Sequence, residues 1–266
     1  MRLHVQFDGT NFHGWQLQGE LRTVQKVLRQ AVEAMVLHRV TLHASSRTDA
    51  GVHARGLPVT FRTTSKIPDY GMRRGLNSKL PSDVSVMTVD EQHYDYWVRA
   101  DTVAKTYTYR VLLGSSRQPL VGRFSWHLGY DSLDLKGMRE AAQHIVGEHS
   151  FEAFRAQGCQ AKTTIRRIYQ IDVDEPDSQG VVCIRVIGNA FLRNMVRIIA
   201  GTLIRVGLGK EPPSWVEAVV ASRDRSHRGM TAPACGLTLT QVHYEGYPRL
   251  TVDKFRRKTN EVPCNP

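Results

Sequence analysis

The sequence contains few cysteines and no long apolar run, and both shortages exclude classes of protein. The four cysteines form no C-x-x-C pair, so their spacing predicts neither a zinc site nor a dense disulfide framework. No stretch approaches the roughly 20 uninterrupted apolar residues of a membrane span, and the opening segment alternates apolar with polar residues, unlike a secretory signal. We therefore expect a cytoplasmic protein that does not enter a membrane. The cysteines are Cys159, Cys183, Cys235 and Cys264.

Acidic residues are also scarce. The 266 residues include 25 Asp and Glu against 36 Lys and Arg, which gives a net charge of +11 with histidine neutral. Residues 178–210 contain no acidic side chain, and residues 50–81 contain only Asp69. Two such segments can fold into one cationic surface, because neutralising phosphates rewards clustered cations. A polyanionic partner is one interpretation, and a solvated basic protein is the other.

Several common catalytic motifs are missing. Gly207-Leu208-Gly209-Lys210 resembles part of a phosphate-binding loop, but Glu211 stands where Ser or Thr is needed. The eleven histidines include no H-E-x-x-H pattern, and neither G-x-S-x-G nor G-x-G-x-x-G occurs. We therefore expect no catalytic metal, and nothing in the motifs favours a hydrolase or a dinucleotide-binding enzyme.

Hydropathy patterns predict a mixed chain with more strands than helices. Its length fits one large or two compact domains. Helical spacing predicts helices over 24–35, 135–146 and about 190–206, and Ser214 with Glu217 has capping-box spacing at the start of a fourth. This mixture predicts an α+β fold with a largely antiparallel sheet. Alternation predicts strands over 3–7, 58–61, 84–89, 106–112, 168–173, 181–187 and 237–243.

Residues 45–54 combine turn-forming residues with three polar side chains. Asp49-Ala50-Gly51 is typical of a turn, because glycine adopts positive φ easily and aspartate can bond its own backbone. Arg47, Asp49 and His53 stand beside this turn in an acid-poor region. A lone carboxylate among cations can stay ionised in a closed pocket. The segment is therefore either a candidate site or a purely structural turn.

The string R-T-D-A-G-V-H-A at residues 47–54 resembles the catalytic loop of the TruA family of tRNA pseudouridine synthases. The resemblance extends from about residue 7 to residue 239, and it departs from many relatives at Ser46, where they have glycine. It implies the pseudouridine synthase fold, with an active-site cleft between two similar α/β domains. Further blocks in the family's order are F-D-G-T at 7–10, G-W-Q at 14–16, Asn77 with Leu80-Pro81, K-T-Y-T-Y-R at 105–110, N-A-F-L-R at 189–193 and Gly236-Leu237.

The domain boundaries that go with this resemblance are residues 1–102 for the N-terminal domain with the Asp loop and residues 103–246 for the C-terminal domain. Residues 247–266 would then be a basic tail. No shift in composition marks the division near residues 99–105.

Three catalytic residues are implied by the resemblance. Asp49 would be the nucleophile, Tyr107 would lie against the target uracil, and Arg197 would pair with the Asp49 carboxylate. Burial raises a carboxyl pKa and a close arginine lowers it by about 1–3 units, so we expect Arg197 to keep Asp49 ionised. From the residues alone, Arg197 could also be an exposed helix residue. Tyr107 and Tyr109 share one face of a predicted strand, so one of them can pack in the core.

The resemblance also implies substrate contacts. Arg47 would enter the space left by the flipped nucleotide, and Leu237 would form an apolar wall of the pocket. Apart from the resemblance, the charge of Arg193 suits it to hold the RNA backbone, although it could equally be a solvated charge. The implied partners are the tRNA anticodon stem-loop, with uridines at tRNA positions 38–40 as targets, and a second copy of the chain in a homodimer. No cofactor is implied.

The implied reaction isomerises uridine to pseudouridine. A carboxylate can form the covalent adduct at the sugar C1′ or at the ring C6, and we favour a sugar adduct that loses its C2′ proton to give a glycal. One competing hypothesis is an RNA-binding chaperone or scaffold with the same fold. Another is a glycosidase, but such enzymes use two carboxylates, and no second candidate accompanies Asp49.

Overall fold

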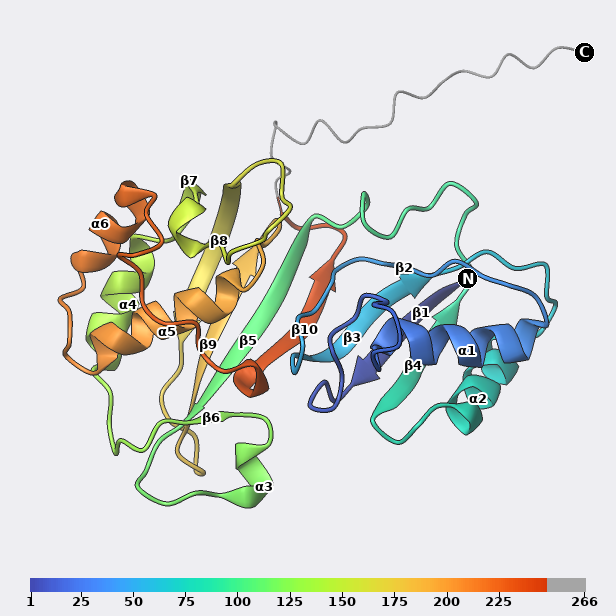
Figure 1. Ribbon diagram of the computed structural model, residues 1–266, viewed down its shortest axis with the longest axis horizontal. Helices are drawn as coiled ribbons and strands as arrows, with labels where there is room; N and C mark the ends of the chain where they lie inside the picture. The colour runs from blue at the N-terminus through green and yellow to red at the C-terminus, as the bar shows by residue number, and fades with distance from the viewer. Residues whose placement is uncertain (248–266) are drawn as a thin grey trace, which may run out of the picture.

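One β-sheet runs through the whole of the described molecule (Figure 1). The computed structural model describes residues 1–247, and within them ten strands follow the order β4-β1-β3-β10-β5-β9-β8-β7, with β2 beside β3 and β6 beside β5. All pairs are antiparallel except β10 with β3 and β6 with β5. The predicted α+β class with a largely antiparallel sheet is confirmed. The strands are β1 (Arg2–Phe7), β2 (His43–Ala44), β3 (His53–Thr60), β4 (Val84–Asp90), β5 (Ala104–Leu112), β6 (Trp126–His127), β7 (Gly147–Ser150), β8 (Ile165–Val173), β9 (Val181–Gly188) and β10 (Leu237–His243).

The helices divide between the two halves of the sheet. In Figure 1, α1 and α2 lie over the half formed by β1, β3 and β4, and α4, α5 and α6 lie over the half formed by β5, β9 and β8. The Thr23 side chain caps the first helix by accepting from the Lys26 N–H at 3.3 Å, as its position predicts. The helices are α1 (Val24–Val36), α2 (Asp69–Lys79), α3 (Pro119–Gly122), α4 (Leu135–Gln143), α5 (Met195–Gly207) and α6 (Trp215–Ser222), with 3₁₀ turns η1 (Glu152–Phe154) and η2 (Ala234–Gly236).

The late strand β10 joins the two halves. It pairs in parallel with β3, where Thr238 stands opposite His53, and antiparallel with β5, where Leu239 stands opposite Tyr107. Because side chains alternate along a strand, these central strands have two different faces. Tyr107 and Tyr109 belong to the main hydrophobic core together with residues of α1 and α5, so we call this the helix face. The side that carries Thr238 and Arg110 we call the opposite face.

Two helices start or end differently from the sequence pattern. The pattern predicts a helix from about residue 190, but α5 begins at Met195, because Asn194 adopts a left-handed φ of 59° that a helix cannot contain. Ser214 makes no side-chain cap for α6. The carbonyls of the two prolines before Ser214 already accept the N–H groups of Trp215 and Val216, at 3.0 and 3.1 Å.

The α2 helix was not predicted at all. Its sequence contains Gly71 and Gly75 and is largely polar, so its helical pattern is weak. It is stabilised by tertiary packing, in which Met72 and Leu76 are fully buried. Gly75 lies against the Met35 side chain of α1, where a Cβ would collide with it.

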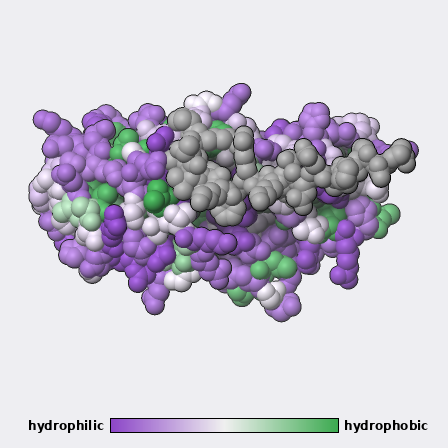
Figure 2. Space-filling model, turned by 90° about the horizontal axis from the view of Figure 1, so that it is seen from above, coloured by the Kyte–Doolittle hydropathy of each residue, from purple (hydrophilic) through white to green (hydrophobic). Residues whose placement is uncertain are grey.

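The predicted division of the chain stays a prediction. The strand β4 ends at Asp90 and β5 begins at Ala104, which brackets the expected boundary near residue 102, but β10 makes the sheet continuous across it. Of the predicted basic tail, residues 248–266 lie outside the described residues. In the described part, no helix has the length and apolarity needed to cross a membrane. Figure 2 shows a face covered mainly by hydrophilic residues, with hydrophobic ones in small groups.

Candidate active site

The loop around Asp49 is fixed by the chain at residues 12–15. The Trp15 N–H donates to the Thr48 carbonyl at 3.1 Å. Gly14 has a φ of +82°, and a Cβ at this position would lie only 2.5 Å from the same carbonyl oxygen. Only glycine allows the two segments to approach so closely. The block at residues 14–16 therefore positions the loop.

The Asp49 carboxylate is half-buried next to the N-terminal end of α5. Burial is the largest influence on its pKa and raises it above the ordinary value of 3.8. The positive charges of Arg197 and then Arg193 lower it, as does a hydrogen bond from the Asn194 N–H. The helix dipole of α5 also favours an anion at this end. We expect Arg197 to help keep Asp49 ionised, and its charge does lower the pKa. The net direction is nevertheless upward, because burial raises the pKa more than the two arginines and the hydrogen bond lower it.

Arg197 does not form the direct ion pair that the sequence resemblance implied. Its Nε donates to the Ala232 carbonyl at 2.7 Å, and its Nη1 donates to the Asn194 Oδ1 at 3.1 Å. Among the ion pairs within 4 Å in residues 1–247, none joins Asp49 to this guanidinium. The guanidinium is held in place by these neutral acceptors, so its charge acts on the carboxylate across a gap.

The two tyrosines of β5 have different environments. The Tyr107 hydroxyl lies 3.0 Å from Ser46 Oγ, and its ring meets Phe191 edge-on with centroids 5.2 Å apart. Burial first, and then the charge of Asp49, raise the pKa of Tyr107 to about 12, although the hydrogen bond with Ser46 lowers it. Tyr109 is fully buried and donates to the Pro233 carbonyl at 2.8 Å. Tyr107 is therefore the tyrosine beside the carboxylate, and Tyr109 belongs to the core.

The other predicted contact residues, Leu237, Arg47 and Arg193, differ in how much of each side chain is exposed to solvent. Leu237 is 4% exposed and stands opposite Tyr109 on the neighbouring strand β10. Arg47 is exposed, two residues before Asp49. Arg193 is also exposed and precedes α5, so it does not share a helix with Arg197 as the pattern predicted.

A cluster of cations beside the site was not predicted. Lys105 stands two residues before Tyr107 on the same face of β5. Burial, together with the nearby charges of Arg99 and Arg166, lowers the pKa of Lys105 to about 8. Burial and then Arg47 lower the pKa of Arg99. These mutual effects show that the four cations lie near one another, although they come from segments far apart in the sequence.

The acid-poor segment at residues 178–210 does not contribute all its cations to one surface. Arg185 forms ion pairs with Asp172 and Asp174, at 3.2 and 3.0 Å, and Arg205 pairs with Glu211 at 2.7 Å. These acids lie outside residues 178–210. An acid-poor stretch of sequence can therefore still have acidic neighbours in the folded protein. Of that segment, Arg193 and Arg197 are the cations that act on Asp49.

His53 has a structural position. It is 3% exposed, its Nδ1 accepts from the Gly9 N–H at 2.9 Å, and its Nε2 donates to the Cys235 carbonyl at 3.1 Å. The His53 Nδ1 also lies 3.1 Å from the Asp8 Oδ1. Burial lowers the pKa of His53, although the charge of Asp8 raises it. In the described part of the chain, no three His, Cys, Asp or Glu side chains group as metal ligands would.

Asn194 and Ser46 are the site residues that sequence reasoning missed. Asn194 contacts both Asp49 and Arg197, and its left-handed φ directs its N–H to the carboxylate. Asparagine is one of the few residues that adopt this conformation readily, but within a helical pattern nothing marks it. Ser46 was noted only as a departure from glycine, yet its hydroxyl contacts Tyr107.

Comparisons with known proteins agree with one another on the family. A family profile described as tRNA pseudouridine synthase matches residues 3–99 and 141–245. The chain is 43% identical over 244 residues to a tRNA pseudouridine synthase A of Geotalea uraniireducens, covering 92% of this chain and 99% of that protein. It is 45% identical over 246 residues to a protein of the same name from Citrifermentans bemidjiense, covering 92% and 97%.

One solved structure that matches this chain is much less similar in sequence. A chain from a crystal structure of a Cbf5-Nop10-Gar1 complex matches 91% of this chain with 14% identity and a TM-score of 0.32. This chain spans 58% of the length of that one. A similarity of this degree carries no argument about function.

Proposed function

The chain belongs to the tRNA pseudouridine synthase family, which consists of isomerases, and we propose that it converts uridines at positions 38–40 of the tRNA anticodon stem-loop with Asp49 as nucleophile. One observation carries this proposal. A half-buried carboxylate accepts the Asn194 N–H, stands in the field of Arg197 and Arg193, and neighbours the Tyr107 hydroxyl. Such a group has the position and the charge environment of a nucleophile.

The reaction is an internal transfer of the uracil. The N1–C1′ bond breaks, the base turns, and a C5–C1′ bond forms while the C5 proton leaves and N1 gains one. No electrons are gained or lost, so the proposal requires no redox cofactor. The Asp49 carboxylate attacks C1′ and expels the uracil, or attacks C6 of the ring. In the sugar route that we favour, the C2′ proton leaves as the bond between C1′ and the Asp49 oxygen breaks, which gives a glycal and frees the carboxylate. A proton returns to C2′ when C5 bonds to C1′.

Tyr107 and Arg197 have complementary tasks in this scheme. A pKa of about 12 keeps the Tyr107 phenol protonated at neutral pH, so it can hold the uracil ring and donate a hydrogen bond or a proton. Arg197 favours the ionised Asp49, although burial opposes it. Leu237 supplies apolar surface for the base.

Two exposed arginines suit the RNA around the target. Extruding a nucleotide costs a few kcal/mol of lost stacking. The planar guanidinium of Arg47, exposed beside the Asp loop, can occupy the vacated space. Arg193, exposed before α5, can bind a phosphate. The same proposal includes a homodimer that binds one tRNA across both subunits, and a cytoplasmic location.

Mapping pseudouridine in total tRNA treated with the protein tests this function. We expect modification at positions 38–40, and none in tRNA whose uridines there are replaced by cytidine. Asp49→Asn should bind tRNA and leave uridine unchanged, and Arg197→Ala should bind tRNA but turn over slowly. An Asp49→Asn variant with wild-type turnover would remove the nucleophile from the scheme. Binding without turnover by the wild-type protein would favour the scaffold role instead.

The salt dependence of tRNA binding tests the cationic surface separately. The logarithm of the affinity should fall with the logarithm of salt concentration, with a slope of about −0.9 for each duplex phosphate neutralised. Arg193→Gln should reduce this slope by about one phosphate. A flat response would exclude a groove that binds the RNA backbone.

A further inference from the structure

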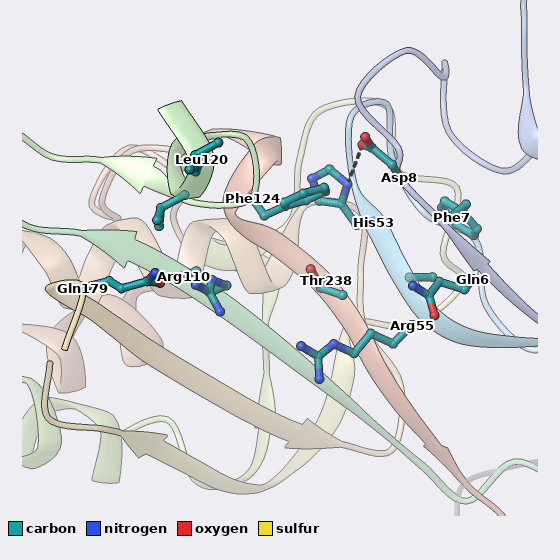
Figure 3. A pocket seen from close by; sticks show the side chains of 12 residues that line it. Gln6, Phe7, Asp8, His53, Arg55, Arg110, Leu120, Phe124, Gln179 and Thr238 are labelled. Carbon is teal, nitrogen blue, oxygen red and sulfur yellow. Dashed lines mark ion pairs between the residues drawn. The ribbon is translucent and has the colours of Figure 1, made fainter. Parts of the chain in front are cut away.

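A cavity of about 330 Å³ lies on the opposite face of the sheet from the catalytic group (Figure 3). It extends over the three central strands, with Arg55 on β3, Thr238 on β10 and Arg110 on β5 in its lining. Tyr109, the neighbour of Arg110 in sequence, belongs to the core of the helix face. The cavity and the Asp49 site are therefore separated by the sheet itself.

Positive charge in this cavity has no acidic partner. Within residues 1–247, neither Arg55 nor Arg110 has an ion pair or a side-chain hydrogen bond, and the Arg110 Nε is buried without any acceptor. Asp8 is the acid in the lining, and its carboxylate is already bound by Arg123 at 2.7 Å and by the Thr10 hydroxyl at 2.6 Å. A buried guanidinium donor without an acceptor is costly. The cavity therefore favours an anionic ligand that supplies several acceptor oxygens.

The rim of the cavity adds an aromatic surface. Phe124 lies just after α3 with 39% of its surface exposed, and its ring stands edge-on to His53 with centroids 5.0 Å apart. Leu120, within α3, is 96% exposed at the same rim. In Figure 3, Arg110 lies to the left of Thr238 and Arg55 extends below it, and Leu120 and Phe124 lie above them. Guanidinium groups beside an exposed aromatic ring bind a phosphate and a base together.

We propose that this cavity is a second ligand site that takes a nucleotide, with its phosphate between Arg55 and Arg110 and its base against the Phe124 ring. Thr238 offers a hydroxyl to the phosphate, and the amides of Gln6 and Gln179 line the same space. The volume lies at the lower end of the range for small-molecule sites. A free mononucleotide and one nucleotide of an RNA strand present the same chemistry. The site uses none of the residues assigned to uridine isomerisation.

Binding of adenosine 5′-monophosphate, measured by isothermal titration calorimetry, tests the site. This probe has a purine in place of the uracil that the Asp49 site is proposed to take, and Asp49→Asn should bind it like the wild type. The double variant Arg55→Gln, Arg110→Gln should lose affinity by about a hundredfold or more, since each arginine removed costs about tenfold or more. Phe124→Leu should lose about tenfold by losing the stacking surface.

Arg185→Gln is the matched control. Arg185 stands opposite Thr108 in β9 and so shares the opposite face, but its guanidinium is already paired with Asp172 and Asp174. The Arg185→Gln change removes one positive charge, as Arg55→Gln alone does, but Arg185 does not line the cavity, so we expect no loss of affinity. Arg55→Gln alone changes an exposed position and replaces the double variant if that variant fails to fold.

A second arm measures tRNA affinity by filter binding on the same variants. Loss of nucleotide affinity in the double variant identifies a free nucleotide as the ligand. A wild-type protein that ignores the mononucleotide, with a double variant that loses tRNA affinity, identifies a nucleotide of the RNA strand. Either result supports the proposal. Wild-type affinity of the double variant for both ligands, or an equal loss in Arg185→Gln, overturns it.

Discussion

Replacing Gly14 by alanine should damage both stability and catalysis, because two separate penalties meet at this position. A φ of +82° costs an L-residue about 1–2 kcal/mol. The new Cβ would also lie 2.5 Å from the Thr48 carbonyl oxygen and 3.0 Å from the Asp49 carbonyl carbon, both of them backbone atoms. Forcing extra volume into a packed region costs about 1–3 kcal/mol more. We therefore expect Gly14→Ala to reduce the free energy of unfolding by about 2–5 kcal/mol.

Gly19 provides the matched control for this change. Its φ of +45° is also left-handed, but nothing lies within 4 Å of a Cβ there. Gly19→Ala should therefore cost only the conformational part, about 1–2 kcal/mol. The difference between the two variants isolates the collision with the Asp49 loop.

Urea denaturation and single-turnover kinetics on tRNA measure the two effects. Relief of the collision requires the loop to move, and a misplacement of about 1 Å at a reacting group can cost about a hundredfold in rate. We expect that loss for Gly14→Ala and wild-type rates for Gly19→Ala, each in conditions where the variant is folded. Equal stability of the two variants, or full activity of Gly14→Ala, would refute the idea that Gly14 positions Asp49.

Three further predictions concern titrating and hydroxyl groups. Burial raises the pKa of Asp49, so the folded protein binds this proton more tightly than the unfolded chain, and stability falls as pH rises from 3.8 through the raised pKa. Asp49→Asn should therefore be more stable than wild type in urea at pH 7, with the advantage vanishing at lower pH; parallel pH profiles would contradict this. Lys105, whose pKa is lowered to about 8, loses its charge as pH rises through that value. Filter binding should therefore show tRNA affinity weakening between about pH 7 and 9. Lys105→Arg, which stays charged over this range, should abolish this pH dependence. Tyr107→Phe should slow turnover and Tyr109→Phe should not. Each variant should lose about 1 kcal/mol of free energy of unfolding, because each loses the hydrogen bond of its hydroxyl. Equal turnover rates of the two variants would contradict the different roles of the two tyrosines.

The strands that β-alternation predicts are those that pack one face in the core. The strand predicted over 237–243 has the same bounds as β10. Its pattern is clear because Leu237 and Leu239, which are buried, alternate with threonines. The strand predicted over 58–61 lacks the first five residues of β3. Arg55, which is exposed, and Gly56 interrupt the apolar spacing there. The pairs that involve β2 and β6 span two residues each, too short for any periodicity.

The geometry of the site could be predicted only in part. The family resemblance implies that Asp49, Tyr107 and Arg197 form one group, and in the structure the charges of Asp49 and Arg197 and the Tyr107 hydroxyl influence one another. Asn194 has a left-handed φ at the start of α5 and bonds Asp49 in a loop nearly 150 residues earlier in the chain. No local sequence pattern contains a contact of that length. The pKa of Lys105 is lowered first by burial and then by Arg99 and Arg166. Arg166 acts on it from β8, a strand more than 50 residues later in the chain.

The gap between Arg197 and Asp49 has a chemical consequence. A carboxylate in a direct ion pair gives one or both oxygens to the guanidinium, and that contact must loosen before an oxygen attacks carbon. Here the guanidinium is satisfied by the Ala232 carbonyl and the Asn194 side chain, so Arg197 supplies its charge without occupying the carboxylate. The Asn194 N–H donates one hydrogen bond to the carboxylate instead. Burial then raises the pKa, which makes the ionised carboxylate a stronger base and nucleophile than an aspartate held by a direct pair. If Arg197 acts through its position, Arg197→Lys, which keeps the charge but cannot make the same pair of hydrogen bonds, should recover only part of the rate that Arg197→Ala loses.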